Sequence, residues 1–209
     1  MKQTEKALSS KDKILKAAII EFSKHSYELA SLNNICNDNN ISKGLIYHYY
    51  NNKEDLYLAC VKVCYDNFQN FISLNTYDFS NFSQGINDYL NQRFKFFNTN
   101  KVLGRLFFYT VYQPPLELTN KLLELRSSFD NQCIEYFKEA LKNIKLRNSV
   151  TEESALNYFI LFQELFNSYF KKHANPKIEL DDLMKQHEIA LANIINLMLY
   201  GIAKEESQC

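Results

Sequence analysis

The chain has 209 residues, of which 46% are hydrophobic and only seven are Gly or Pro, a composition typical of one large or two small helical domains. The formal net charge is zero, and no apolar run approaches the roughly 18 residues of a membrane-spanning helix. The chain has five cysteines, an odd number, which argues against a disulfide framework. Its first segment lacks the apolar core of a signal peptide. We therefore expect a cytoplasmic protein with reduced thiols.

The charge is unevenly distributed along the chain. Residues 1–53 carry eight Lys against five acidic residues, a net +3, whereas residues 54–209 carry a net −3. A basic N-terminal part favours a nucleic-acid partner there. All four Arg lie beyond residue 53, so contacts to DNA must use Lys, Asn, Ser, Tyr, His or backbone amides. We therefore expect a DNA-binding domain over residues 1–53 and a second domain over residues 54–209.

The most informative segment is Ser31 to Lys53, which reads SLNNICNDNNISKGLIYHYYNNK. It predicts two short helices joined by a polar turn at residues 38–40, with Ile41 buried after the turn and Ser42 as the N-cap of the second helix. This arrangement is typical of a helix-turn-helix, whose second helix enters the major groove of DNA.

The second helix of this motif is expected to bury Ile46 and Tyr50, which share one face. Four residues then face outward: Lys43, Gly44, Tyr47 and His48. A glycine near the start of a helix costs about 1 kcal/mol relative to alanine but lets a partner approach the backbone closely. The simpler alternative is a helical hairpin with surface tyrosines.

The segment SKGLIYHYYNNKEDLY resembles the S-K-G-T-L-Y-H-Y-F-x-x-K-E-E-L signature of the TetR/AcrR family of transcriptional regulators. Upstream, ILKAAIIEFSKHSYELASLNNIC resembles the first helix of that family and the loop and helix that follow it, so that the resemblance covers about residues 11 to 65. Three positions depart from the family pattern. Ser26 and Asn40 each replace a glycine, and Leu45 replaces a small polar residue. Asparagine is the next best residue at positive φ, so Asn40 is expected to keep the left-handed conformation of the turn.

The resemblance implies an all-α fold, with a three-helix helix-turn-helix domain followed by a larger helical domain for ligand binding and dimerisation. It implies a repressor that binds palindromic double-stranded operator DNA as a homodimer. The expected DNA-binding residues are Ser31, Asn33, Ser42, Lys43, Gly44, Leu45, Tyr47, His48, Tyr49 and Lys53. Among these, Lys43, Gly44 and Asn33 are expected at bases, Leu45 at a thymine methyl, and most of the others at phosphates.

The rest of the chain shows only helical patterns. A helix from about residue 53 to 72, with apolar residues on two faces, is expected to connect the two domains and to transmit ligand binding. Further helices are expected over residues 83–98, 102–112, 116–144, 151–173 and 180–203.

The second domain is rich in aromatic residues, since the chain has 14 Tyr and 16 Phe but no Trp. Most of these side chains belong to the core, but a pocket between the helices would suit a flat apolar effector or an aromatic cation. The expected lining residues are Phe97, Phe107, Tyr112, Phe129, Cys133, Phe162 and Phe166.

The last two helices are apolar on more than one face, which favours pairing with a second copy of the chain over burial in a monomer. The residues expected at this dimer interface are Phe159, Tyr169, Leu191, Ile195 and Met198.

No pattern indicates an enzyme, a metal site or a cofactor. Cys60 and Cys64 share a helix face and could sense oxidants, although packing in the core is the simpler interpretation. The leading hypothesis is thus a regulator controlled by a small molecule whose identity the sequence does not give. The alternative is a DNA-binding regulator controlled by a protein partner or by thiol redox.

Overall fold

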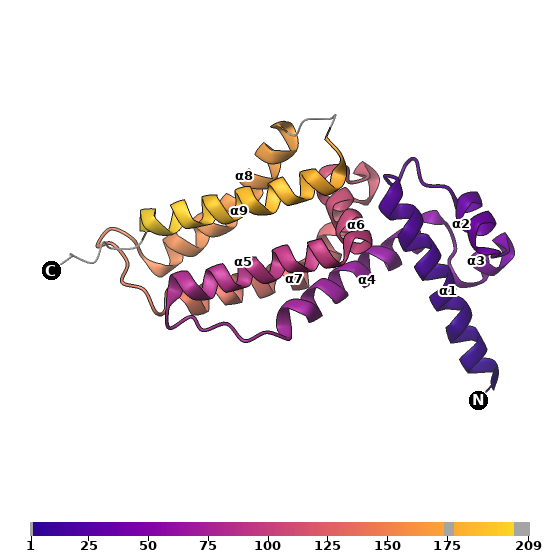
Figure 1. The fold of residues 1–209 in the computed structure, drawn as a ribbon, viewed down its shortest axis with the longest axis horizontal. Helices are drawn as coiled ribbons and strands as arrows, with labels where there is room; N and C mark the ends of the chain where they lie inside the picture. The colour runs from indigo at the N-terminus through magenta and orange to yellow at the C-terminus, as the bar shows by residue number, and fades with distance from the viewer. Residues whose placement is uncertain (1, 174–177, 203–209) are drawn as a thin grey trace. The chain divides into compact units, whose positions relative to one another are not determined.

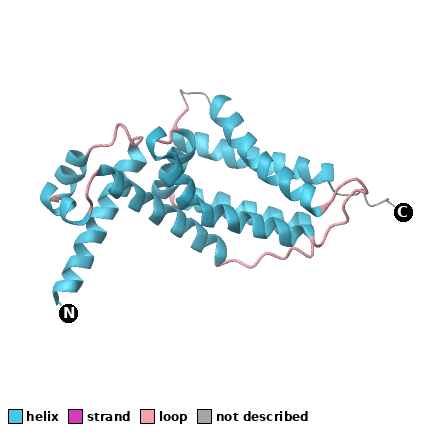
Figure 2. Ribbon diagram, turned by 180° about the vertical axis from the view of Figure 1, so that it is seen from behind, coloured by secondary structure: helices cyan, strands magenta, loops and turns pink. Residues whose placement is uncertain are grey.

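The structure is a computed structural model that describes residues 2–173 and 178–202, and within these ranges it is helical and contains no strand (Figures 1 and 2). The helices are α1 (Lys2–Lys24), α2 (Leu32–Asn39), α3 (Lys43–Tyr49), α4 (Lys53–Ser73), α5 (Phe82–Thr99), α6 (Lys101–Tyr112), α7 (Thr119–Leu141), α8 (Glu152–His173) and α9 (Leu180–Ile202). The all-α prediction is confirmed, and most helix ends fall within two residues of the expected positions.

The long helix expected over residues 116–144 is shorter at both ends. It is preceded by a turn of 3-10 helix at Leu116–Leu118, in which the Leu118 N–H donates to the Pro115 carbonyl over 3.0 Å. Prolines 114 and 115 have no N–H to donate, so the chain enters the helix through this tighter turn. The regular helix then runs from Thr119 to Leu141.

The residues form two compact units. The first contains residues 1–67 and 100–126, and the second contains residues 68–99 and 127–209. The helices α4 and α7 each contribute residues to both units. Because this grouping follows compactness, it does not test whether residues 1–53 alone bind DNA, and the expected boundary after residue 53 stays a prediction.

In the first unit, α6 packs against α1 and α4. The Tyr109 hydroxyl donates to the Lys24 carbonyl over 3.3 Å, and the hydroxyls of Tyr65 and Thr110 lie 3.0 Å apart. The α4 residues predicted to be buried on two faces are mostly enclosed, with Leu56 and Val61 at 0% exposure. The helix that follows the helix-turn-helix is therefore fixed to the same core.

In the second unit, α9 packs against α5 and α8. Phe68, at the end of α4, is fully buried and lies within about 5 Å of the rings of Phe96, Phe97 and Phe129. The interior of this unit is accordingly aromatic, as the composition suggested.

Candidate functional site

The turn between α2 and α3 has the geometry expected of a helix-turn-helix. Ser31 caps α2, since its hydroxyl accepts a hydrogen bond from the Asn33 N–H over 3.2 Å. Asn40 ends the helix with φ 50° and ψ 49°, the left-handed conformation that asparagine tolerates better than most residues. Ile41 is then buried, as predicted.

The helix α3 has one buried side and one exposed side. Ser42 caps it by accepting a hydrogen bond from the Leu45 N–H over 3.2 Å. Ile46 is fully buried and Tyr50, at the C-cap, nearly so. The residues left exposed are Lys43, Gly44, Tyr47 and His48. The predicted orientation of this helix is confirmed, whereas the DNA contacts assigned to its residues stay predictions.

Gly44 is not required by the fold. A methyl group added at its Cα would meet no other atom within 4 Å. Gly44 lies inside α3, and no glycine among the described residues has a positive φ that would require this residue type. Glycine therefore lowers the stability of α3 at this position, although neither packing nor backbone conformation within the chain requires it.

Glu21 of α1 positions α2, a role that sequence reasoning missed. Its side chain is buried, and its Oε1 accepts hydrogen bonds from the Ser31 N–H over 2.9 Å and from Asn34 Nδ2 over 3.0 Å. A carboxylate near the first turn of α2 is also favourable for the helix dipole. The one available signal was an acidic residue inside the apolar stretch AAIIEFS.

Lys53, expected at a phosphate, also makes contacts within the chain. Its Nζ lies 4.7 Å from the centre of the Tyr27 ring and donates to the Glu28 carbonyl over 3.5 Å. Burial lowers the pKa of this amine, partly offset by the charges of Glu28 and Glu21. Lys53 therefore ties α4 to the segment before α2, whatever it contacts outside the chain.

Comparison with known proteins agrees with this geometry. Residues 14–60 match the family model of the bacterial regulatory proteins of the tetR family. Over 195 residues the chain is 27% identical to IcaR, the negative transcriptional regulator of the biofilm operon icaADBC of Staphylococcus epidermidis, with 90% of this chain and 98% of the relative covered. The chain belongs to the TetR family of transcriptional regulators. IcaR from Staphylococcus aureus strain Newman is 26% identical to the chain over 194 residues, covering 90% of this chain and 98% of that protein.

Solved structures agree with the fold of this TetR-family regulator. The fatty acid degradation regulator FadR from Bacillus halodurans superposes with a TM-score of 0.60 at 20% identity, covering 87% of this chain and 94% of that one. A TetR-family regulator from Chloroflexus aurantiacus gives 0.60 at 15% identity and 94% coverage of both chains. TetR-family relatives are transcription regulators rather than enzymes, which confirms the expectation that this chain is no enzyme.

The residues expected to line an effector pocket are buried or half-buried but fall in different units. Phe107 and Tyr112 belong to the first unit, while Phe97, Phe129, Cys133, Phe162 and Phe166 belong to the second. Their grouping into one pocket stays a prediction. Within the second unit, four of the five contact a buried polar network that sequence reasoning missed.

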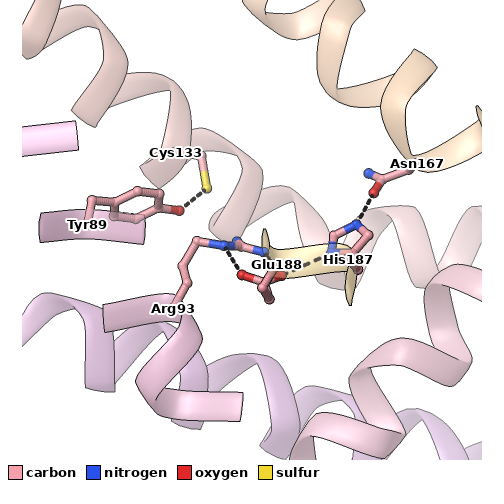
Figure 3. A network of polar contacts seen from close by, with 6 residues as sticks. All are labelled: Tyr89, Arg93, Cys133, Asn167, His187 and Glu188. Atoms are coloured by element: carbon pink, nitrogen blue, oxygen red, sulfur yellow. Dashed lines mark hydrogen bonds and ion pairs between the residues drawn. The ribbon is translucent and has the colours of Figure 1, made fainter. Parts of the chain in front are cut away.

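The centre of this network is an ion pair between α5 and α9 (Figure 3). Arg93 donates through Nε to Glu188 Oε2 over 3.0 Å and through Nη2 to Oε1 over 2.9 Å. His187 extends the network, with Nδ1 3.0 Å from Glu188 Oε1 and Nε2 3.1 Å from Asn167 Oδ1 of α8. Beside the ion pair, the Tyr89 hydroxyl lies 3.0 Å from Cys133 Sγ.

Phenylalanine rings surround this network. The Arg93 guanidinium lies 5.3 Å from the ring centre of Phe68, 5.7 Å from Phe97 and 5.9 Å from Phe129. The His187 ring contacts Phe166 at 4.9 Å.

The ion pair keeps both Arg93 and Glu188 ionised although both are buried. Burial alone would raise the pKa of Glu188, but the charge of Arg93 and the contacts with His187 outweigh it and lower that pKa to about 2. Burial would likewise lower the pKa of Arg93, yet Glu188 raises it above its ordinary value. Both groups are ionised at neutral pH.

The thiols expected to offer a redox alternative are buried. Burial raises the pKa of Cys60 and of Cys64 well above that of an ordinary thiol, and Cys64 Sγ donates to the Leu103 carbonyl over 3.2 Å. A protonated, enclosed thiol reacts poorly with oxidants. No group of residues in the described part of the chain is arranged to hold a metal ion, and none of its helices is long and apolar enough to cross a membrane.

Four of the five residues expected at a dimer interface are enclosed within the chain itself: Phe159, Leu191, Ile195 and Met198. Only Tyr169 is exposed, at 62%. The exposed apolar residues of α8 are Tyr158, Ile160, Leu161, Leu165 and Tyr169, and those of α9 are Ile189 and Leu197. The helices are apolar on two sides, and four of the residues expected at a dimer interface lie on the side that faces the core of their own chain.

Replacing Glu21 by alanine should lower the free energy of unfolding by about 1–3 kcal/mol, because the half-buried Ser31 N–H loses its acceptor. Glu21→Gln keeps an oxygen at the same place and should retain most of the stability. Urea denaturation of the three proteins measures the difference. An alanine variant as stable as the wild type would show that this contact does not hold α2 in place.

The lowered pKa of Glu188 predicts a specific acid sensitivity. The stabilisation from the ionised carboxylate is present above about pH 4.5, its unfolded value, and is lost as the pH falls towards about 2. Replacing both Arg93 and Glu188 by Met should leave the stability at pH 7 nearly unchanged.

The same double variant should lose less stability than the wild type between pH 5 and pH 2.5, by a difference on the order of 2–3 kcal/mol. Urea denaturation across this pH range measures both curves. Parallel curves for the two proteins would contradict the assignment.

Proposed function

We propose that this TetR-family regulator is a repressor that binds palindromic operator DNA as a homodimer and leaves it when a small effector binds. The observation that carries the proposal is the exposed face of α3, which combines donors for DNA with a glycine that the fold does not need. Its IcaR relatives are negative regulators, which supports repression rather than activation.

The buried side of α3 determines which of its residues can face DNA. With Ile46 turned inward, Lys43 and Gly44 lie exposed at the start of the helix and are assigned to base edges. Tyr47 and His48 are assigned to phosphates, together with Ser31, Tyr49 and Lys53 from the flanking segments. Asn33, exposed on α2, is assigned to a base.

The proposed dimer uses the exposed stripe of α8. Tyr158, Leu161, Leu165 and Tyr169 follow each other at intervals of three or four residues, so they share one face of the helix. Leu197 of the neighbouring α9 is 70% exposed and supplies further apolar surface. A two-fold axis through this surface would bury it in both copies and pair two reading helices with a palindrome.

Release of the operator requires that effector binding alter the reading helices. The helix α4 belongs to both compact units, with Lys53 at one end and Phe68 and Ile72 near the other. It is therefore our proposed element of communication. A hundredfold loss of operator affinity needs a coupling free energy of about 2.7 kcal/mol between effector and DNA. The buried state of Cys60 and Cys64 favours a small molecule over thiol redox as the signal.

Gly44→Ala separates stability from DNA binding. Because an added methyl has open space within the chain, the substitution should raise the free energy of unfolding by up to about 1 kcal/mol. The same methyl should obstruct the approach of DNA and lower operator affinity by about tenfold or more. Fluorescence anisotropy with the operator, combined with urea denaturation, measures both quantities.

Lys43→Ala provides the second arm of this test. It should weaken the operator complex by about 1–3 kcal/mol and relax the preference among bases. Gly85→Ala serves as the control for glycine substitution, since an added Cβ there would lie 2.5 Å from Phe79 and should destabilise the chain. Normal operator affinity in both Gly44→Ala and Lys43→Ala would reject α3 as the reading helix.

Leu165→Glu tests the dimer surface. Leu165 is 59% exposed in the single chain, so a carboxylate there should leave the monomer folded but disfavour the dimer by burying a charge. We expect monomers by light scattering and loss of operator binding, with far-ultraviolet circular dichroism unchanged. Leu74→Glu, at a leucine that is 85% exposed and outside the stripe, is the matched control.

A Leu165→Glu protein that remains a dimer would rule out this surface. Ile195→Glu is unsuitable for the purpose, because Ile195 is buried within its own chain and the substitution should unfold it.

A further inference from the structure

The interior of the second unit contains a cation in an unusual setting. Arg93 is buried among three phenylalanine rings, and its polar contacts are the carboxylate of Glu188 and the hydroxyl of Tyr89. Replacing a buried ion pair by apolar residues of similar size is often neutral or even stabilising. Stability alone therefore gives little reason for an arginine at this position, and a role in recognition has to be considered.

Arg93 retains donors for a second anion. An arginine side chain has five N–H donors. The ion pair with Glu188 uses one on Nε and one on Nη2, and even if the Tyr89 hydroxyl takes a third, the guanidinium keeps donors on its other edge. The Arg93 side chain is also the more accessible of the pair, at 8% exposure against 3% for Glu188. A planar guanidinium can bind two carboxylates along two of its edges.

Glu188 has a second partner and need not move with Arg93. Its Oε1 lies 3.0 Å from His187 Nδ1, and His187 is in turn held by Asn167. A second carboxylate on Arg93 would thus leave Glu188 hydrogen-bonded rather than unpaired in an apolar interior.

The same geometry argues against a cationic effector. The ring faces of Phe97 and Phe129, which were expected to attract an aromatic cation, already lie around the guanidinium of Arg93. A second cation there would meet a like charge at short range in a medium of low dielectric constant. A neutral ligand could accept a hydrogen bond from Arg93 but would not form an ion pair with it.

We propose that the effector of this regulator is an apolar monocarboxylate whose carboxylate binds Arg93 and whose apolar body packs among the phenylalanines of the second unit. The proposal rests on the proposed function, because it names the ligand class of the same effector site. It replaces the flat apolar effector or aromatic cation expected from the sequence with an apolar anion. Phe68, Phe97 and Phe129 are the rings around the Arg93 guanidinium and would contact the first carbons of the ligand.

The test uses ligands that differ only in their head group. Octanoate, decanoate and dodecanoate, each with its matching amide and amine and all below their micellar concentrations, are titrated into the full-length protein by calorimetry. The same compounds are then added to the protein–operator complex, and release is followed by fluorescence anisotropy. We expect at least one carboxylate to bind and to lower operator affinity by about tenfold or more, with its amide and amine much weaker.

Two double variants assign the effect to Arg93. Arg93→Met with Glu188→Met removes the guanidinium without leaving a buried charge unpaired, and should keep operator binding while abolishing the carboxylate response. Glu135→Met with Lys138→Met removes an exposed ion pair of the same unit, with the same zero change in net charge, and should respond as the wild type does.

The outcomes separate this proposal from the function on which it rests. If the ligand-free wild type binds no operator, the proposed function fails. If it binds operator but none of the carboxylates binds the protein, or an amine binds better, the carboxylate proposal is overturned. It is equally overturned if the Arg93→Met, Glu188→Met protein retains the response.

Discussion

The burial of one side of α3 is the constraint on which the proposed function depends. This helix has seven residues, too few to be stable alone in water. Ile46 anchors it in the core, and Ser42 satisfies an amide at its start. Because both anchors lie on the inner side or at the end, the opposite side is held outward with little freedom. A donor such as Lys43 is thus presented in a fixed direction, which reduces the ordering that binding to DNA requires.

A buried carboxylate, that of Glu21, fixes the neighbouring helix α2 in a similar way. Glu21 binds the first turn of α2, which holds the turn before α3 in register. The first unit thus uses a buried carboxylate to hold the exposed helix-turn-helix in a fixed geometry, which the proposed DNA binding requires. In the second unit the ion pair of Arg93 with Glu188 joins α5 to α9 in an aromatic interior, where apolar residues of similar size could pack equally well. This difference in setting is why we assign positioning to Glu21 and recognition to Arg93.

Local features were predictable from the sequence, whereas long-range pairings were not. The cap at Ser42, the left-handed Asn40 and the inward Ile46 each depend on residues within four positions, and the structure has them as predicted. Glu188 and Arg93 are 95 residues apart, so only the packing of α5 against α9 brings them together. The proposed dimer surface illustrates the same limit, because periodicity found α8 apolar on two sides but could not tell which side faces the core of its own chain.

The central claim is that two copies of α3 read a symmetric operator, and footprinting tests it most directly. An operator selected by the protein from random-sequence DNA would be cleaved by hydroxyl radicals with and without protein. The account predicts two protected patches, related by two-fold symmetry and centred about one helical turn or slightly more apart. A single protected patch, or protection without symmetry, would contradict it.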